Sequence, residues 1–179
     1  MRKIEDVTLK NGRSLKEVLE LHKKWLEGEK DGGKADLSYE YLSDIDFSDL
    51  NLTYANLRGA NLRGTKLTGV NLGYADLTGA NLKGADLTGV NLRSANLIGA
   101  DLIGSNLTYA DLLGSNLSGA YLSYANLRCS DLTGANLKDA NLRDANLTDV
   151  KYDNTTAFLS YNVQKKGVLL DIRKQMIKS

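Results

Sequence analysis

Leucine recurs at every fifth residue over most of this chain, as in the stretch ANLIGADLIGSNLTYADLLG of residues 95–114. This spacing suits neither regular element. On an α-helix, residues five apart would spread around the axis, and on a strand they would alternate between its two sides. A five-residue period therefore predicts a chain that turns a corner after each unit, so that one large side chain per unit faces a common axis.

The tract from 35 to 149 divides without insertion into 23 such units, whose positions we call −2, −1, centre, +1 and +2. The centre is Leu in 22 units and Phe47 in the other, position −2 is Ala in 14 units, and position −1 is Asn or Asp in 20. Centre and −2 residues are two apart, so they point to the same side of an extended segment. So short a unit buries nothing alone, and the units must stack around a core of these residues.

The corners are predicted from position +2, which is Gly in 11 units. Glycine supplies the positive φ that a type II turn requires. Where +2 is Tyr, Asp or Ser, we expect a different turn. The chain has 17 glycines and no proline, which indicates turns that need positive φ while every backbone N–H stays in use.

The number of units per coil follows from the bulky −2 residues. Leu50, Val70, Val90 and Val150 are separated by multiples of 20 residues. This spacing favours four units per coil, a square cross-section and nearly six coils. With ~4.8 Å between stacked strands, the rod would be about 25–30 Å long.

The signature A(N/D)LxG, repeated in tandem through about two-thirds of the chain, resembles the pentapeptide-repeat family. The resemblance implies an all-β solenoid, the right-handed quadrilateral β-helix, with centre and −2 residues inside and the others outside. It also implies a bacterial origin. Some members of the family imitate duplex DNA and bind type II topoisomerases, protecting them against quinolones or inhibiting them.

The open ends of a solenoid need caps. Residues 1–34 are expected to form the N-terminal cap, with an amphipathic helix over about 14–28, a capping box at Ser14-Leu15-Lys16-Glu17, and Trp25 as the plug of the core. Gly28 is expected to end this helix, and the Asn11-Gly12 pair predicts a short hairpin before it.

The pattern decays in residues 150–179, where Tyr152 keeps a centre position and Phe158 is expected to close the core. The tail carries Leu169, Ile172 and Met176 at helical spacing. We expect this tail either to cap the C-terminal coil or to pair with a second copy of the chain.

No constellation for catalysis, metal binding or cofactor binding stands out, so we expect neither an enzyme nor a cofactor. The single histidine, His22, lies on the apolar stripe of the cap helix, which is typical of a structural histidine. The single cysteine, Cys129, lies at a corner and fits a reducing compartment such as the bacterial cytoplasm.

Hydrogen-bonding ladders explain the repeated Asn and Asp more simply than calcium sites do. No apolar run approaches the ~18 residues of a membrane helix.

Charge argues against nucleic acid as a partner and weakens the case for DNA mimicry. Mimicry needs a dense, continuous negative field along the rod. Between Leu50 and Gly134 there are six basic and five acidic residues, so the middle coils are near neutral. Binding to DNA would need a continuous basic stripe along the rod. No such stripe is predicted, because Arg63 and Lys83, which should stack on successive coils, are followed 20 residues later by Ile103.

The remaining class is a non-catalytic interaction or scaffold protein with an unidentified protein partner. Its candidate contact residues are Ile98, Ile103, Tyr109 and Leu113, which should lie on one coil and project outward. Position +1 is apolar in no other unit of the tract, although harmless strand-forming substitutions would explain the same residues. Ile98 and Ile103, on adjoining faces, form the best pair.

Overall fold

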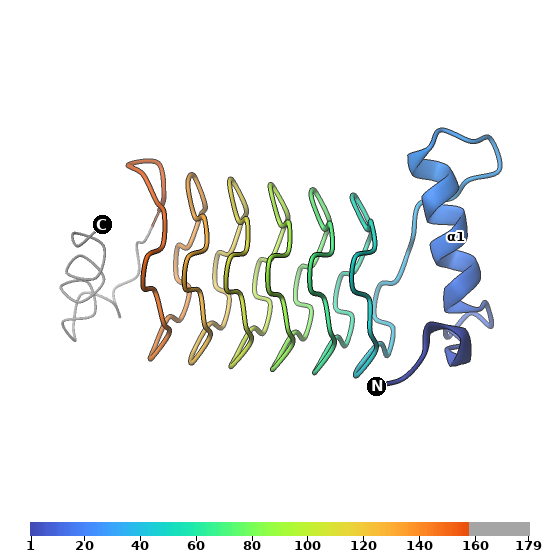
Figure 1. Cartoon of the computed structure of the whole chain (residues 1–179), viewed down its shortest axis with the longest axis horizontal. Coiled ribbons are helices and arrows are strands. Elements are labelled where there is room, and N and C mark those ends of the chain that lie inside the picture. The colour runs from blue at the N-terminus through green and yellow to red at the C-terminus, as the bar shows by residue number, and fades with distance from the viewer. Residues whose placement is uncertain (158–179) are drawn as a thin grey trace.

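The chain is an elongated stack of coils with a helix across one end. The computed structural model describes residues 1–157 (Figure 1). Two helices come first, the 3-10 helix η1 (Ile4–Asp6) and the α-helix α1 (Leu15–Leu26). The coils that follow are joined by isolated parallel bridges rather than by long strands. Within the described residues, no helix has the length and apolar character needed to cross a membrane.

The coils stack in a constant register. Parallel bridges join −1 residues that are 20 apart, from Asp36↔Asn56 to Asp131↔Lys151. Around each bridge, backbone groups pair with the next coil: Leu97 N–H donates to the Asn116 carbonyl at 2.7 Å, and Asn116 N–H donates to the Ala95 carbonyl at 2.9 Å. Four units therefore make one coil, as the spacing of bulky residues predicts.

Every corner of the tract has the same turn geometry, so the expectation of a different turn at non-glycine corners is wrong. At Gly59 the +2 residue has φ 61°, and the turn closes by a 3.0 Å hydrogen bond from Ala60 N–H to the Leu57 carbonyl. Tyr74 and Asp144 hold φ values of 58° and 56° at the same position. Positive φ at +2, without positive φ at +1, is the pattern of a type II turn. Because the coils stack in register, each corner must follow the corner below it, whichever residue occupies it.

The repeated Asn and Asp residues complete the hydrogen bonding of each unit. The Oδ1 atom of the −1 residue accepts a hydrogen bond from the +1 backbone N–H, at 3.1 Å from Asn81 to Lys83. This Asx geometry explains the residue types at −1. The predicted ladder between coils is also present, for example from Asn91 Nδ2 to Asn71 Oδ1 at 3.0 Å. With all five N–H groups of a typical unit bonded, proline has no place in the tract.

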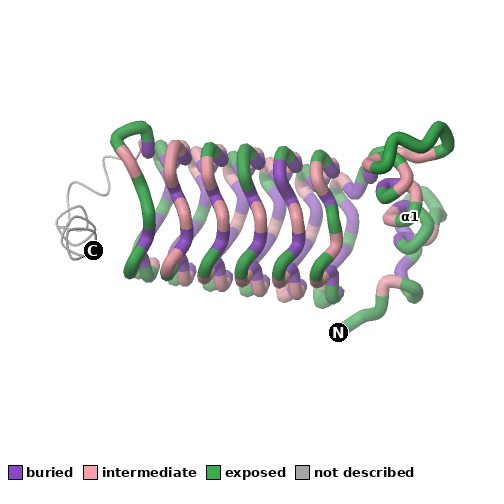
Figure 2. The backbone as a smooth tube through the Cα atoms, turned by 45° about the horizontal axis from the view of Figure 1, so that its top comes forward, coloured by how far each residue is buried: buried purple, intermediate pink, exposed green. Residues whose placement is uncertain are grey.

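Centre and −2 side chains fill the axis, and most residues at the other positions are partly or fully exposed. Buried and more exposed residues therefore alternate around each coil (Figure 2). The one acidic −2 residue, Glu40, is also buried. Both of its carboxylate oxygens accept a hydrogen bond from the Lys10 backbone N–H at 3.1 Å. Glu40 therefore ties the N-terminal segment to the first coil.

The N-terminal cap differs from its prediction in detail. Helix α1 is shorter than residues 14–28, and the predicted capping box is not formed: Ser14 makes no side-chain cap hydrogen bond, and Glu17 pairs with Arg13 at 3.1 Å instead. Gly28, with φ 77°, ends the helix as predicted. The predicted hairpin is present as a bridge between Thr8 and Ser14.

Trp25 does not plug the core, contrary to the prediction, because the residue is 37% exposed. Its ring stacks on His22 at 5.7 Å and meets the edge of Tyr54 at 6.2 Å. Leu15 and Val18, nearer the start of the helix, are the residues that join the buried core.

The last described coil loses the regular pattern. Tyr152 holds the centre position of its unit but is 41% exposed. The final bridge joins Asn136 and Ala157, which are 21 rather than 20 apart, and the Thr156 hydroxyl donates to the Leu132 carbonyl at 3.0 Å. Phe158 and the predicted cap or pairing segment of the tail lie outside the described residues.

Candidate interaction surface

The four residues predicted as contacts lie on one coil, at its four successive corners. The coil of residues 95–114 stacks in register on the coils before and after it. Tyr109 is 60% exposed, Ile98 is 40% exposed, and Ile103 and Leu113 are half-buried. Because they occupy different corners, they do not form a single flat site.

Two further tyrosines, Tyr121 and Tyr124, lie beside Ile98 and Ile103. Tyr121 pairs with Asp101 of the coil below through a parallel bridge, so it lies on the side that Ile98 and Ile103 flank. Tyr124 follows at the corner above Gly104. We call Ile98, Ile103, Tyr121 and Tyr124 the isoleucine–tyrosine face. The sequence signal was available, since Ile103 and Tyr124 are 21 apart and so occupy neighbouring positions on successive coils.

The tyrosines in and beside this face occupy positions where the fold favours other residues. Tyr121 stands at −1 and has no oxygen like that of Asn or Asp to accept the +1 N–H. Tyr109 and Tyr124 hold a left-handed backbone with φ 61° at +2, a conformation that suits glycine. The left-handed corner alone does not set Tyr109 and Tyr124 apart, since 12 of the 23 corners carry a residue other than glycine. The departure at Tyr121 is rarer, because 20 of the 23 units have Asn or Asp at −1, and rare departures from local preference concentrate at functional sites.

Tyrosines near the N-terminal end have a structural explanation that these three lack. The Tyr54 and Tyr74 rings stack at 5.0 Å, and Trp25 of α1 packs on Tyr54. The Lys10 ammonium lies 4.6 Å from the centre of the Tyr41 ring. Among residues 1–157, no ring contact, ion pair or side-chain hydrogen bond is found for Tyr109, Tyr121 or Tyr124. Their rings face solvent.

The titratable residues His22 and Cys129 have structural rather than chemical roles. His22 is buried, and its Nδ1 accepts a hydrogen bond from Ala35 N–H at 3.1 Å. Burial lowers the pKa of His22, because it penalises the charged form of the ring. The Cys129 thiol lies 3.9 Å from a carboxylate oxygen of Asp149, with no histidine beside it. Among the described residues, no group of three or more His, Cys, Asp or Glu side chains could hold a metal ion.

The constant register and the inward leucines define the class of this protein, a parallel β-solenoid with four five-residue units per coil. A family model described as pentapeptide repeats, with 8 copies, matches residues 45–84, 85–123 and 115–151. The chain belongs to the pentapeptide-repeat family. Proteins of this family are generally structural rather than enzymatic.

Solved structures of several pentapeptide-repeat proteins are similar to this chain. A protein of the thylakoid lumen of Arabidopsis thaliana is 31% identical, with a TM-score of 0.54, over 59% of this chain and 72% of that one. HetL, involved in regulation of heterocyst differentiation in the cyanobacterium Nostoc sp. strain PCC 7120, is 32% identical over 72% of this chain and 76% of its own, with a TM-score of 0.39. A trypsin-treated variant of QnrB1, a plasmid-mediated fluoroquinolone resistance protein, is 23% identical over 78% and 71%, also with a TM-score of 0.39. A comparison with curated proteins found no match.

Proposed function

We propose that this chain is a non-catalytic protein-binding rod, a right-handed quadrilateral β-helix of about six coils with α1 as its N-terminal cap. Its contact surface is the isoleucine–tyrosine face, and Tyr109 and Leu113 extend the same level around the other corners. The partner is another protein, and the bacterial cytoplasm is the location that the single, unpaired Cys129 and the family resemblance favour.

The observation that carries this proposal is the exposure of side chains that the rod does not need. Tyr121 and Tyr124 are 52% and 60% exposed, at positions where Asn and Gly would fit the backbone better. Ile98 and Ile103 add apolar area on the same side of the rod. Tyrosine and other aromatic residues are enriched in the centres of protein interfaces, where burying them stabilises the complex.

Modulation of a type II topoisomerase by DNA mimicry is the alternative that the family suggests. The acidic side chains of the tract concentrate at its two ends, as with Asp44 and Asp49 in the first coil and Asp144 and Asp149 near the last. The coils between them are near neutral, whereas duplex DNA presents evenly spaced charge along its whole length. The charge distribution therefore favours the apolar face over mimicry.

Site-specific photocrosslinking in the cells that make the protein tests the proposed surface. With p-benzoylphenylalanine in place of Tyr124, we expect one discrete crosslinked protein, and with the same group in place of Tyr74 we expect little of it. Replacing Ile98 and Ile103 by Thr should reduce the yield from position 124 about tenfold, since two buried side chains are lost from the contact.

The matched control replaces Arg58 and Lys83 by Thr, because these residues occupy the same two +1 columns on lower coils. This control should leave crosslinking unchanged. Equal crosslinking from positions 74 and 124, or a yield that survives loss of both isoleucines, would show that the face is not a contact. Light scattering of the purified wild-type chain and of the isoleucine variant separates a second copy from a different protein as the partner.

The topoisomerase alternative has its own assay. Supercoiling by DNA gyrase is measured with increasing amounts of the purified chain, in the presence and absence of a quinolone. Our proposal expects no change in either reaction at micromolar protein. Inhibition of supercoiling, or protection from the quinolone, would favour mimicry instead.

A further inference from the structure

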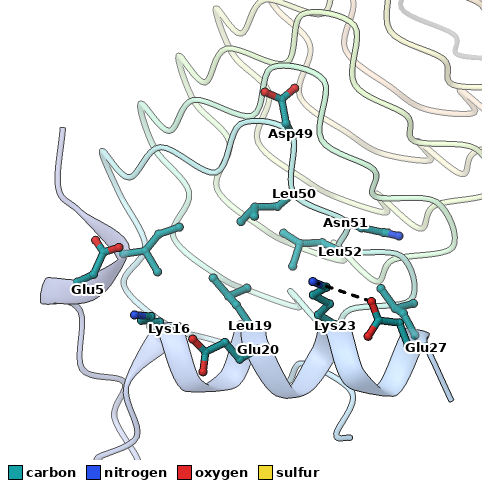
Figure 3. Close-up of a pocket in the computed structure, with 12 residues that line it drawn as sticks. Glu5, Lys16, Leu19, Glu20, Lys23, Glu27, Asp49, Leu50, Asn51 and Leu52 are labelled. Atoms are coloured by element: carbon teal, nitrogen blue, oxygen red, sulfur yellow. Dashed lines mark ion pairs between the residues drawn. The ribbon is translucent and has the colours of Figure 1, made fainter. Parts of the chain in front are cut away.

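Helix α1 leaves an open groove at the N-terminal end of the rod. The groove has a volume of about 660 Å³ and lies between α1 and the first coil (Figure 3). In the close-up, Leu19 of α1 and Leu50 and Leu52 of the coil point toward one another across it. The cap therefore touches the rod along one edge and stands away from it along this groove.

The floor of the groove is apolar and incompletely covered. Leu19 and Leu26 of α1 are only half-buried. Leu50 is also half-buried, although nearly all other −2 residues of the tract are fully buried. A second apolar surface in the groove would gain roughly 25 cal/mol for each Å² of apolar area removed from water.

The rim of the groove carries more negative than positive charge. Its acidic residues are Glu5, Glu20, Glu27 and Asp49, and its basic residues are Lys16 and Lys23. Lys23 lies 4.0 Å from Glu27 and partly neutralises it. An apolar floor within an acidic rim suits an amphipathic helix whose polar face is basic.

The chain itself contains a segment of this chemistry. Residues 158–179 include five basic residues and one acidic residue. Within them, Leu169, Ile172 and Met176 recur at the spacing of one helical face, with Arg173 and Lys174 between them. We propose that the amphipathic segment 168–178 of one copy binds in the groove of a second copy, so that rods join head to tail.

Distance favours a second copy over the same chain. Ala157, the last described residue, belongs to the coil farthest from α1, after six steps of the bridge ladder from Asp36. Six steps at ~4.8 Å place it about 29 Å from the first coil. The twelve residues from there to Leu169 span at most ~40 Å when fully extended, so a chain docking in its own groove would run nearly straight along the rod.

Docking between copies carries no such constraint, and it produces a heterologous contact. The copy that donates its tail keeps its groove free, and the copy that receives the tail keeps its own tail free, so further copies can add at both ends. Contacts of this kind build open filaments unless a ring closes. The head-to-tail contact is separate from the isoleucine–tyrosine face and does not depend on the function proposed for it.

Sedimentation velocity of the full-length chain over the micromolar range tests the proposal. The mean mass of the wild-type chain should rise with concentration and fall with added salt, because rim charges are screened. The double substitution Glu20→Lys and Glu27→Lys should weaken association about tenfold, as should Arg173→Glu with Lys174→Glu. Combining both pairs in one chain should restore association at least in part.

The matched control is Glu17→Lys with Glu29→Lys, which makes the same charge change in the N-terminal cap outside the groove. It should associate like the wild-type chain, and circular dichroism checks that all variants fold. A mean mass that stays at the monomer value at every concentration overturns the proposal. Association that is as strong in both charge-reversal variants as in the wild-type chain also overturns it. Loss of association when Ile98 and Ile103 are both replaced by Thr would also overturn it, by moving the contact to the isoleucine–tyrosine face.

Discussion

At the scale of single residues, stacking overrides the intrinsic preference of the chain. Tyr39, Asp49 and Ser94 hold the left-handed backbone at +2 as closely as glycine does, with φ values of 59°, 61° and 54°. This conformation costs a residue with a side chain roughly 1–2 kcal/mol. The hydrogen bonds of coils above and below offset that cost, so that a preference that determines the turn in an isolated peptide no longer does so here.

Two glycine corners allow the energetic cost of the left-handed backbone to be separated from the cost of a steric clash. Gly79 and Gly59 have nearly equal φ values of 63° and 61°. A Cβ at 79 would meet nothing within 4 Å, whereas a Cβ at 59 would lie 2.5 Å from the Tyr39 ring. We expect Gly79→Ala to lower the free energy of unfolding by about 1 kcal/mol, and Gly59→Ala to cost about 0.5–1.5 kcal/mol more because the ring must move.

Urea denaturation of the two variants measures the difference directly. Replacing Tyr39 by Ala in the Gly59→Ala background serves as the control, since it removes the atoms that the new methyl group meets. Equal costs for the two glycine variants would mean that the Tyr39 ring moves aside freely.

At the scale of elements, α1 is held by fewer residues than its apolar stripe suggests. Leu15 is fully buried at the start of the helix, whereas Trp25 near its end is 37% exposed. Leu15→Ala should therefore lower the free energy of unfolding of the cap by about 2–4 kcal/mol, and Trp25→Ala should lower it by about 1 kcal/mol through the lost ring contacts. Hydrogen exchange of the α1 amides reads the stability of the cap separately from that of the rod. A larger loss of stability in Trp25→Ala than in Leu15→Ala would show that Trp25 closes the core, as first predicted.

The same helix gives the cap a dependence on pH. The folded chain holds the pKa of His22 below its ordinary value of 6.5, chiefly because burial penalises the charged ring. The neutral ring is therefore the stable form, and its contribution is fully present above pH 6.5. It is lost as the pH falls from 6.5 to the lowered pKa, since the unfolded chain binds the proton first.

Protection of the α1 amides from hydrogen exchange, measured between pH 7.5 and pH 5, should fall in the wild-type chain after correction for intrinsic exchange rates. The variant His22→Gln keeps an acceptor for Ala35 N–H and should show no such fall. The lowered pKa of Asp46, whose carboxylate accepts hydrogen bonds from Ser48, acts only below the ordinary aspartate value of 3.8 and does not interfere. A parallel fall in both chains would assign the effect to another group.

At the scale of the whole molecule, the sequence predicts the rod well and its surface less well. The register was predictable because Leu50, Val70 and Val90 fill the same place on successive coils, and only a repeat of 20 residues brings them together. The exposure of Trp25 depends on the angle at which α1 meets the first coil, which no periodicity within either element specifies. The groove has the same origin.

The contact surface was half predictable for a related reason. Ile98 and Ile103 stand out along the chain, because +1 is otherwise polar or glycine outside their coil. Tyr121 and Tyr124 stand out only across the chain, where residues about 20 apart become neighbours. Comparing residues that stack on successive coils therefore identifies the isoleucine–tyrosine face. Comparing consecutive units along the sequence identifies only single unusual residues.

The central claim is that Tyr121 and Tyr124 serve contact with a partner and lower the stability of the rod. The free energy of unfolding of the double variant Tyr121→Asn and Tyr124→Gly tests it without any partner. The first substitution would supply the missing acceptor for the +1 N–H, worth about 1 kcal/mol. The second would relieve the left-handed backbone, less the entropy that glycine adds to the unfolded chain. We predict that urea denaturation finds the variant about 1 kcal/mol more stable than the wild-type chain. A variant that is less stable would show that the two tyrosines support the fold, and would contradict the claim.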